Sequence, residues 1–220
     1  HPFDKKLERM KGASEEKIIN SYYLDEEQVQ LISDTLADPN SKYDIQDRLI
    51  WHIALDSANR VGAISSLTIS SLDIENMIFE DIREKRGYRV EVVFEEYTRD
   101  ILLEWLEMRK EMDNLEVDSI FITRHLGEYR PMTKGTIQER VRKIGEILGL
   151  DDFHIHCIRK TTLNLVYKQT GDLSLAADLG NHKSVETTRQ AYIKPQSKSE
   201  VREKIAKMRK EKMKKSEEVK

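Results

Sequence analysis

Apolar side chains recur at helical spacing along most of the chain. Val29, Ile32 and Leu36 form one such stripe, and Asp25 stands where it can cap a helix that starts just after it. Further helices are predicted at residues 45–57, 97–112, 133–148, 156–169, 173–179 and 184–192. The pattern therefore predicts a mainly helical protein.

The period of the pattern changes between residues 77 and 94. The segments MIFEDI and YRVEVVF are rich in β-branched and aromatic residues, and Gly87 lies between them in a stretch suited to a tight turn. They predict a β-hairpin, and FIT at 121–123 predicts a short extended piece. The fold class is therefore α+β, mainly α, with a small antiparallel β-sheet (the hairpin near 77–94) packed among helices.

The two ends of the chain differ from the middle. Residues 1–21 are polar without a sustained period, so we expect a linker or tail there and an ordered domain over residues 22–194. Residues 195–220 predict a basic tail helix, in which Val201, Ile205 and Met208 make a narrow apolar stripe. This stripe fits either a solvated helix that frays or a helix that docks on a neighbouring protein molecule.

Composition narrows the class of protein. The chain has 220 residues, of which 38% are hydrophobic and 35% charged, so it can form one sizeable soluble domain. No apolar run approaches the roughly 18 residues of a membrane span, and no signal segment is visible, so we expect no membrane partner. One cysteine excludes an internal disulfide, which favours a reducing compartment and hence the cytoplasm.

Charge is unevenly distributed along the chain. The formal net charge is -3, which by itself argues weakly against binding to nucleic acid. From Leu150 onward, however, Lys and Arg outnumber Asp and Glu by 16 to 10, whereas 21 basic and 30 acidic residues precede that point. Only the basic second part fits a polyanion such as DNA.

The stretch FHIHCIRKTT at 153–162 carries candidate chemistry. His154, His156 and Cys157 are side chains that zinc accepts, but no HExxH, second cysteine or paired carboxylates at ligand spacing accompany them, so a structural histidine is the simpler alternative. Arg159 follows His156 by three positions, which puts both on one face of a helix. An arginine fork there suits a phosphate group, although a lone HxxR carries little weight.

Motifs on either side of this stretch give it more weight. In LGNHKSVETTRQAYIK, His182 precedes a Thr-Thr pair and then Tyr192, and in ANRVGAISS, Arg60 stands at a helix start. Lys85 lies in the turn of the predicted hairpin. Taken together and in this order, these features over about residues 22–194 resemble the catalytic domain of the tyrosine recombinases, the phage and transposon integrase family.

The resemblance implies a set of catalytic residues and partners. Its motif positions fall on Arg60, Lys85, His156, Arg159 and His182, with Tyr192 as the nucleophile. It also implies a tetrameric synapse on double-stranded DNA attachment sites with tail exchange between protomers, no cofactor, and a location on the nucleoid. Residues 1–21 would be the linker from a missing N-terminal DNA-clamp domain.

Elementary chemistry agrees with these roles. A tyrosine with a pKa near 10 needs a base or a cationic pocket to become a nucleophile, and His156 can take its proton. Arg60, Arg159 and His182 can stabilise the charge that builds on the phosphate, and Lys85 can protonate the leaving oxygen. The resemblance implies a 3′-phosphotyrosyl intermediate, resealed without ATP. The basic second half and the hairpin loop would bind DNA phosphates, through Lys160, Lys183 and Arg86.

Two departures from the family pattern keep alternatives open. An acidic residue often follows the first arginine by three positions, where this chain has Ala63, and L-G-H is replaced by Gly180, Asn181 and His182. A type IB topoisomerase or telomere resolvase shares the fold and the tyrosine chemistry. A catalytically silent DNA-binding regulator on the same fold, and a zinc-dependent hydrolase using His154 and His156, are further alternatives.

Overall fold

The computed structural model describes residues 22–84, 87–112, 116–182, 184–194 and 197–217. Helices make up most of it, together with two small antiparallel sheets, so the predicted fold class is confirmed. The predicted linker at 1–21 lies outside the described residues. Within the described part, no helix is both long enough and apolar enough to cross a membrane.

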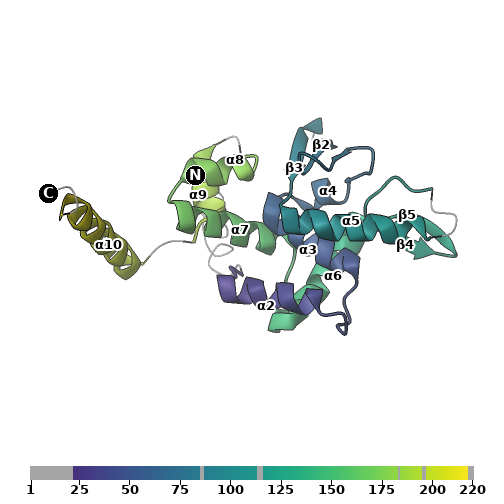
Figure 1. Ribbon diagram of the computed structural model, residues 1–220, viewed down its shortest axis with the longest axis horizontal. Helices are drawn as coiled ribbons and strands as arrows, with labels where there is room; N and C mark the ends of the chain where they lie inside the picture. The colour runs from purple at the N-terminus through teal and green to yellow at the C-terminus, as the bar shows by residue number, and fades with distance from the viewer. Residues whose placement is uncertain (1–21, 85–86, 113–115, 183, 195–196, 218–220) are drawn as a thin grey trace, which may run out of the picture.

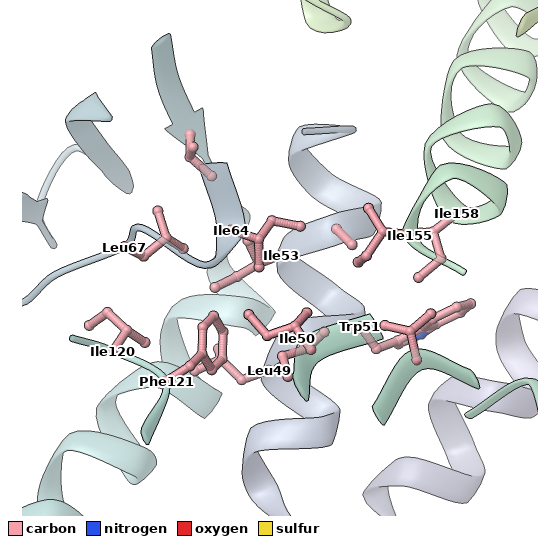
Figure 2. Close-up of a cluster of buried hydrophobic side chains, with 14 of the residues drawn as sticks. Leu49, Ile50, Trp51, Ile53, Ile64, Leu67, Ile120, Phe121, Ile155 and Ile158 are labelled. Atoms are coloured by element: carbon pink, nitrogen blue, oxygen red, sulfur yellow. The ribbon is translucent and has the colours of Figure 1, made fainter. Parts of the chain in front are cut away.

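Helix α3 (Ile45–Ser57) lies at the centre of the body and packs against α2 (Glu26–Ala37), α5 (Glu96–Lys110), α6 (Lys134–Gly145) and α7 (Ile155–Thr170). Asp25 and Asp44 cap α2 and α3 with complete capping boxes, which satisfy free N–H groups at both helix starts. Leu49, Ile50 and Trp51 are fully buried although they are consecutive, so α3 is apolar around most of its circumference. Figure 2 shows these side chains meeting those of neighbouring elements in one core.

The predicted hairpin forms the three-stranded sheet with a short additional strand. Strands β1 (Leu72–Asp73), β2 (Ile78–Arg83) and β3 (Arg89–Val93) pair antiparallel in that order, and an irregularity interrupts the β2–β3 register between Phe79 and Ile82. Phe79 and Val92 point into the core from this sheet. The short helix α4 (Val61–Ile64) begins directly after Arg60. The sheet and α4 therefore lie at the same edge of the body (Figure 1).

The extended piece predicted at 121–123 belongs to a second hairpin, which the sequence pattern did not predict. Strands β4 (Ile122–His125) and β5 (Glu128–Pro131) pair across a two-residue loop of Leu126 and Gly127. Both loop residues have positive φ, 51° and 87°, and Leu is a poor sequence signal for such a turn.

The C-terminal part is built on α7. A 3₁₀ turn, η2 (Glu146–Leu148), follows α6. Phe153, just before α7, packs so closely on Gly145 that a Cβ atom at position 145 would collide with the Phe153 side chain, and this contact fixes where α7 starts. Helices α8 (Leu173–Leu179) and α9 (Val185–Tyr192) pack against α7. The tail helix α10 (Lys198–Glu217) projects away from the body (Figure 1). The Nζ of Lys204 on α10 lies 5.9 Å from the ring centroid of Tyr167 on α7.

Candidate active site

The first turn of α7 has an apolar face and a polar face, which have different roles. Ile155 and Ile158 are three positions apart and are buried in the core, as Figure 2 shows. His156 and Arg159, offset by one position, share the adjacent face. The apolar pair therefore fixes the helix, and the fixed helix sets the direction of the polar pair.

Arg159 is the anchor of the candidate site. It is 1% exposed, and its Nη1 donates a hydrogen bond to the carbonyl oxygen of Ala58 while its Nη2 donates to the carbonyl of Gly180 at 2.5 Å. Ala58 ends α3 in the left-handed conformation, with φ at 49°. Because the two carbonyls belong to loops 122 residues apart, the guanidinium joins the end of α3 to the turn after α8.

The hydrogen bonds of His182 define its tautomer. Its Nε2 lies 2.6 Å from Arg159 Nη2, and its Nδ1 lies 2.7 Å from the Thr188 hydroxyl. Since a guanidinium only donates, Nε2 accepts from Arg159, and Nδ1 carries the proton that it shares with Thr188. Burial, and then the cations Arg159 and Arg60, lower the pKa of His182 to about 4, which agrees with a neutral ring.

Tyr192 lies within the same cluster of its own chain. It is 6% exposed, and its ring centroid is 5.2 Å from that of His156 and 4.6 Å from that of His182. The guanidinium carbon of Arg159 lies 5.0 Å from the tyrosine ring. The ring also packs on Ala58 and Leu163 in a small second apolar cluster. Both apolar packing and cationic contact therefore hold Tyr192 beside the two histidines.

His156 is neutral at physiological pH. Removal of part of its ring from water, and then the nearby cations Lys160 and Arg159, together lower its pKa to about 4, although the residue as a whole remains exposed. A neutral imidazole with an open edge is in the form that a general base requires.

Arg60 completes the cationic side of the site. It precedes α4, its side chain is 44% exposed, and its Nη1 donates a hydrogen bond to Glu84 Oε2 at 2.8 Å. Its positive charge lowers the pKa of Arg159 and of both nearby histidines, so it lies within electrostatic range of all three. The two arginines approach the cluster from different elements, α4 and α7.

A model of the phage integrase family matches residues 22–199 of the chain. The chain belongs to the phage integrase family. Among curated proteins, the tyrosine recombinase XerA of Saccharolobus solfataricus is 24% identical over 165 residues, which is 75% of this chain and 50% of that protein. The chain thus spans half the length of this curated relative.

Several solved structures share the fold. XerA recombinase superposes with a TM-score of 0.69 at 23% identity, covering 85% of this chain and 65% of that one. The XerH recombinase, in a post-cleavage complex with its difH substrate, gives a TM-score of 0.68 at 22% identity over 84% of this chain and 52% of XerH. The Tn1549 transposon integrase in complex with transposon right end DNA gives 0.60 at 16% identity, over 84% of this chain and 65% of that one.

Of the catalytic residues expected for a phage integrase, the structure brings five together. They are Arg60, His156, Arg159, His182 and Tyr192. The sixth, Lys85, lies outside the described residues, as do the expected DNA-binding residues Arg86 and Lys183. The catalytic and DNA-binding roles of all these residues stay predictions.

Lys160 was expected to contact DNA, but the structure places it largely in the interior. The residue is 5% exposed, burial lowers the pKa of its ammonium group, and its Nζ lies 5.8 Å from the ring centroid of Tyr23. The reason is the helical period: Lys160 follows Arg159 by one position and so points to a different side of α7. The segment around Leu24 covers that side, where the Leu24 N–H donates to the neighbouring Thr161. Its contact with DNA stays a prediction that this burial does not favour.

The alternative zinc site at the start of α7 lacks a full ligand set among the described residues. Cys157 Sγ lies 3.3 Å from His154 Nδ1, whereas the ring of His156 faces Tyr192. No group of three or more His, Cys, Asp or Glu side chains in the described part of the chain is placed to hold a metal ion.

Sequence reasoning missed several groups that shape the site. Two of them are the backbone carbonyls of Ala58 and Gly180, which no side-chain pattern reveals. A third is Asn59, which is buried and donates to the carbonyl of Glu91 on β3 while its Oδ1 lies 3.5 Å from Asn181 Nδ2. Its position next to Arg60 was the one available signal.

Proposed function

We propose that this chain is the catalytic domain of a site-specific DNA recombinase, or integrase. It would cleave and rejoin DNA through a 3′-phosphotyrosyl intermediate without a metal ion or ATP. The observation that carries the proposal is the burial of Tyr192 against two imidazoles and the guanidinium of Arg159 in one chain. A tyrosine in such surroundings is what metal-free attack on a phosphodiester requires.

Cleavage is one in-line displacement at phosphorus. The Tyr192 oxygen forms the new bond to phosphorus, and the bond from phosphorus to the 5′-oxygen of the leaving strand breaks. His156 takes the phenolic proton, for which its neutral ring is suited. Lys85 gives a proton to the leaving 5′-oxygen. Attack by the 5′-hydroxyl of a second strand on the phosphotyrosyl bond reverses these steps, so no external energy source is needed.

The two arginines would hold the scissile phosphate. Three of the five N–H groups of Arg159 bond two carbonyls and His182, so the guanidinium is held in place and would contribute chiefly a fixed positive charge beside the phosphate. Arg60 is partly exposed and has one hydrogen bond among the described residues, which leaves donors for a non-bridging oxygen. His182 supports Arg159 through its Nε2, and contact of that atom with phosphate would require it to leave the arginine.

The partners we propose are a double-stranded DNA attachment site and further copies of this chain in a tetrameric synapse. Solved relatives include XerH bound to its difH substrate and a lambda integrase dimer bound to a core site. Because its substrate is chromosomal or element DNA, the protein would work in the cytoplasm on the nucleoid.

The tail helix α10 is proposed to bind a neighbouring protomer. It projects from the body, and Val201 and Ile205 are exposed on it; the side chain of Met208 lies outside the described ones. Two apolar side chains left exposed by the rest of the described residues support docking onto a second copy. Deletion of residues 195–220 is expected to abolish synapsis on DNA in gel-shift assays while single-site binding persists, and unchanged synapsis would contradict the exchange.

The test of the proposed function is covalent trapping. The protein is incubated in excess EDTA with a pool of nicked duplexes of randomised sequence and then denatured in detergent. A DNA-linked species is expected, and mass spectrometry should locate the DNA on the peptide that contains Tyr192. Tyr192→Phe must lose the adduct. DNA binding without any adduct would favour the catalytically silent regulator, and an adduct abolished by EDTA would favour a metal-dependent hydrolase.

A further inference from the structure

Glu84 is an acidic residue inside a site that otherwise gathers cations. It directly follows β2, and the hairpin backbone places it: the N–H of Glu84 donates to the carbonyl of Tyr88 at 2.7 Å, and its own carbonyl accepts from the N–H of Gly87. Its side chain is 8% exposed. Carboxylates are rarely buried to this degree unless they are paired.

The two oxygens of this carboxylate have different surroundings. Oε2 accepts the hydrogen bond from Arg60 Nη1 at 2.8 Å, whereas Oε1 is buried and has no hydrogen-bond partner among the described residues. The negative charge of Glu84 also acts on Arg159, where it opposes the lowering of the pKa that burial causes. The carboxylate is therefore within electrostatic range of both arginines of the site.

The position three residues after Arg60 cannot supply this carboxylate. It is occupied by Ala63, a residue of α4 that is fully buried in the core. The partner of Arg60 comes from the hairpin instead, from the residue that immediately precedes Lys85. Two arginines in one pocket repel each other, and a carboxylate that bonds one of them reduces that repulsion and limits its rotamers.

We propose that Glu84 is the positioning residue that holds the Arg60 guanidinium in place for the scissile phosphate, a role that rests on the proposed function. The hydrogen bond uses Nη1, so the remaining N–H groups of Arg60 keep a fixed direction in which they can meet a phosphate oxygen. Glu84 is also the residue that precedes Lys85, the proposed acid, in the sequence.

The experiment measures adduct formation on nicked DNA at saturating DNA, together with DNA affinity, for the full chain and its variants. Glu84→Gln keeps the shape but removes the charge, and the rate is expected to fall roughly 10- to 100-fold, less than removal of a direct oxyanion donor. Affinity should be unchanged or tighter, because one negative charge near the phosphate is lost. Glu84→Asp should recover part of the rate.

Two further variants separate positioning from a general effect of charge or folding. Glu80→Gln, at an exposed position on β2, changes net charge equally and is expected to leave the rate within about twofold of wild type. If Glu84 acts through Arg60, Glu84→Gln should slow an Arg60→Lys variant by less than about threefold, because the two changes damage the same interaction.

Each contrary result has a defined meaning. A Glu84→Gln rate equal to that of Glu80→Gln, or an equal fold-loss in the wild-type and Arg60→Lys backgrounds, would overturn the positioning role. A faster Glu84→Gln variant would overturn it too and make the ion pair inhibitory. Absence of any adduct from the wild-type chain would contradict the proposed function itself, and with it this role.

Discussion

Two buried arginines, Arg109 on α5 and Arg159 on α7, are held in the same way but lie in different surroundings. Arg109 donates to the carbonyls of Val117, Ser119 and Ile120 at 2.6–3.1 Å and lies over the ring of Trp105. Burial lowers the pKa of its guanidinium, as it does for Arg159. Both side chains therefore serve as cross-links between a helix and nearby backbone.

The difference lies in what else each guanidinium meets. The carbonyls bonded to Arg109 all belong to the segment leading into β4, and the aromatic ring beside it is part of the core. Arg159 bonds two loops distant in sequence, contacts His182, and keeps its Nε buried without a partner among the described residues. Burial and hydrogen bonds to carbonyls therefore do not by themselves identify a catalytic arginine. What distinguishes Arg159 is that several titratable side chains meet around it.

The largest effect is expected from matched Arg→Lys changes at these two positions. Lysine offers one compact ammonium group and cannot reach separate carbonyls as the planar fork does. Arg159→Lys should reduce adduct formation by about 10³-fold, because the positive charge under the phosphate is misplaced. Arg109→Lys should leave the rate within a few-fold and lower the free energy of unfolding by about 1–3 kcal/mol, because buried carbonyls lose their donor.

Urea denaturation and single-turnover cleavage below the unfolding transition measure the two quantities separately. Equal losses of cleavage in both variants would show that Arg159 matters only for folding and would remove the distinction between the two arginines.

A smaller effect is expected at the hydroxyl that orients His182. Thr188 is fully buried and accepts the proton of His182 Nδ1. Thr188→Val keeps the volume but leaves that N–H without an acceptor, so cleavage should slow by about 10-fold, comparable to the loss of other partners that orient a histidine. Thr188→Ser restores the hydroxyl and should recover most of the rate. If the Val and Ser variants cleave equally, the tautomer assigned to His182 has no role in the rate.

The smallest effect is a dependence of stability on pH in the DNA-free protein. The pKa of His182 is about 4 in the folded state, lowered by burial and by Arg159, Arg60 and His156, against about 6.5 in an unfolded chain. The unfolded chain therefore binds a proton that the folded one does not between these values, and stability is lost as pH falls from 6.5 toward 4. The urea midpoint should decrease over this window.

The His182→Asn variant serves as the control for this pH dependence. It should show a shallower decrease of the urea midpoint than wild type over the same window. A slope identical to that of wild type would mean that His182 titrates normally.

The helices and the first hairpin could be predicted because their apolar periods are long and regular. Trp51 and Phe79, for example, lie where helical and strand spacing place them. The β4–β5 hairpin could not, since its turn depends on Leu126 adopting positive φ. The pairing of β4 with β5, rather than the local sequence, sets the conformation of this turn.

The candidate site was predictable in its side chains but not in its supports. The order of Arg60, His156, Arg159, His182 and Tyr192 pointed to one site, and the fold brings them together. These side chains are held chiefly by backbone atoms. Because every residue has a carbonyl oxygen, no sequence pattern identifies the two that accept hydrogen bonds from Arg159. Glu84 escaped notice because its partner is 24 residues away across a hairpin whose register the sequence does not fix.

The central claim is that one chain assembles its own site, with Tyr192 acting beside its own Arg159. Mixing Tyr192→Phe with Arg159→Lys protein on nicked DNA tests it directly, with wild type mixed with Tyr192→Phe as the positive control. If each tyrosine acts in its own chain, the mixture of the two variants forms no adduct above the level of either alone, while the control does. An adduct in the mixture, carried by the Arg159→Lys chain, would show that the tyrosine is donated to a neighbour and would contradict the account.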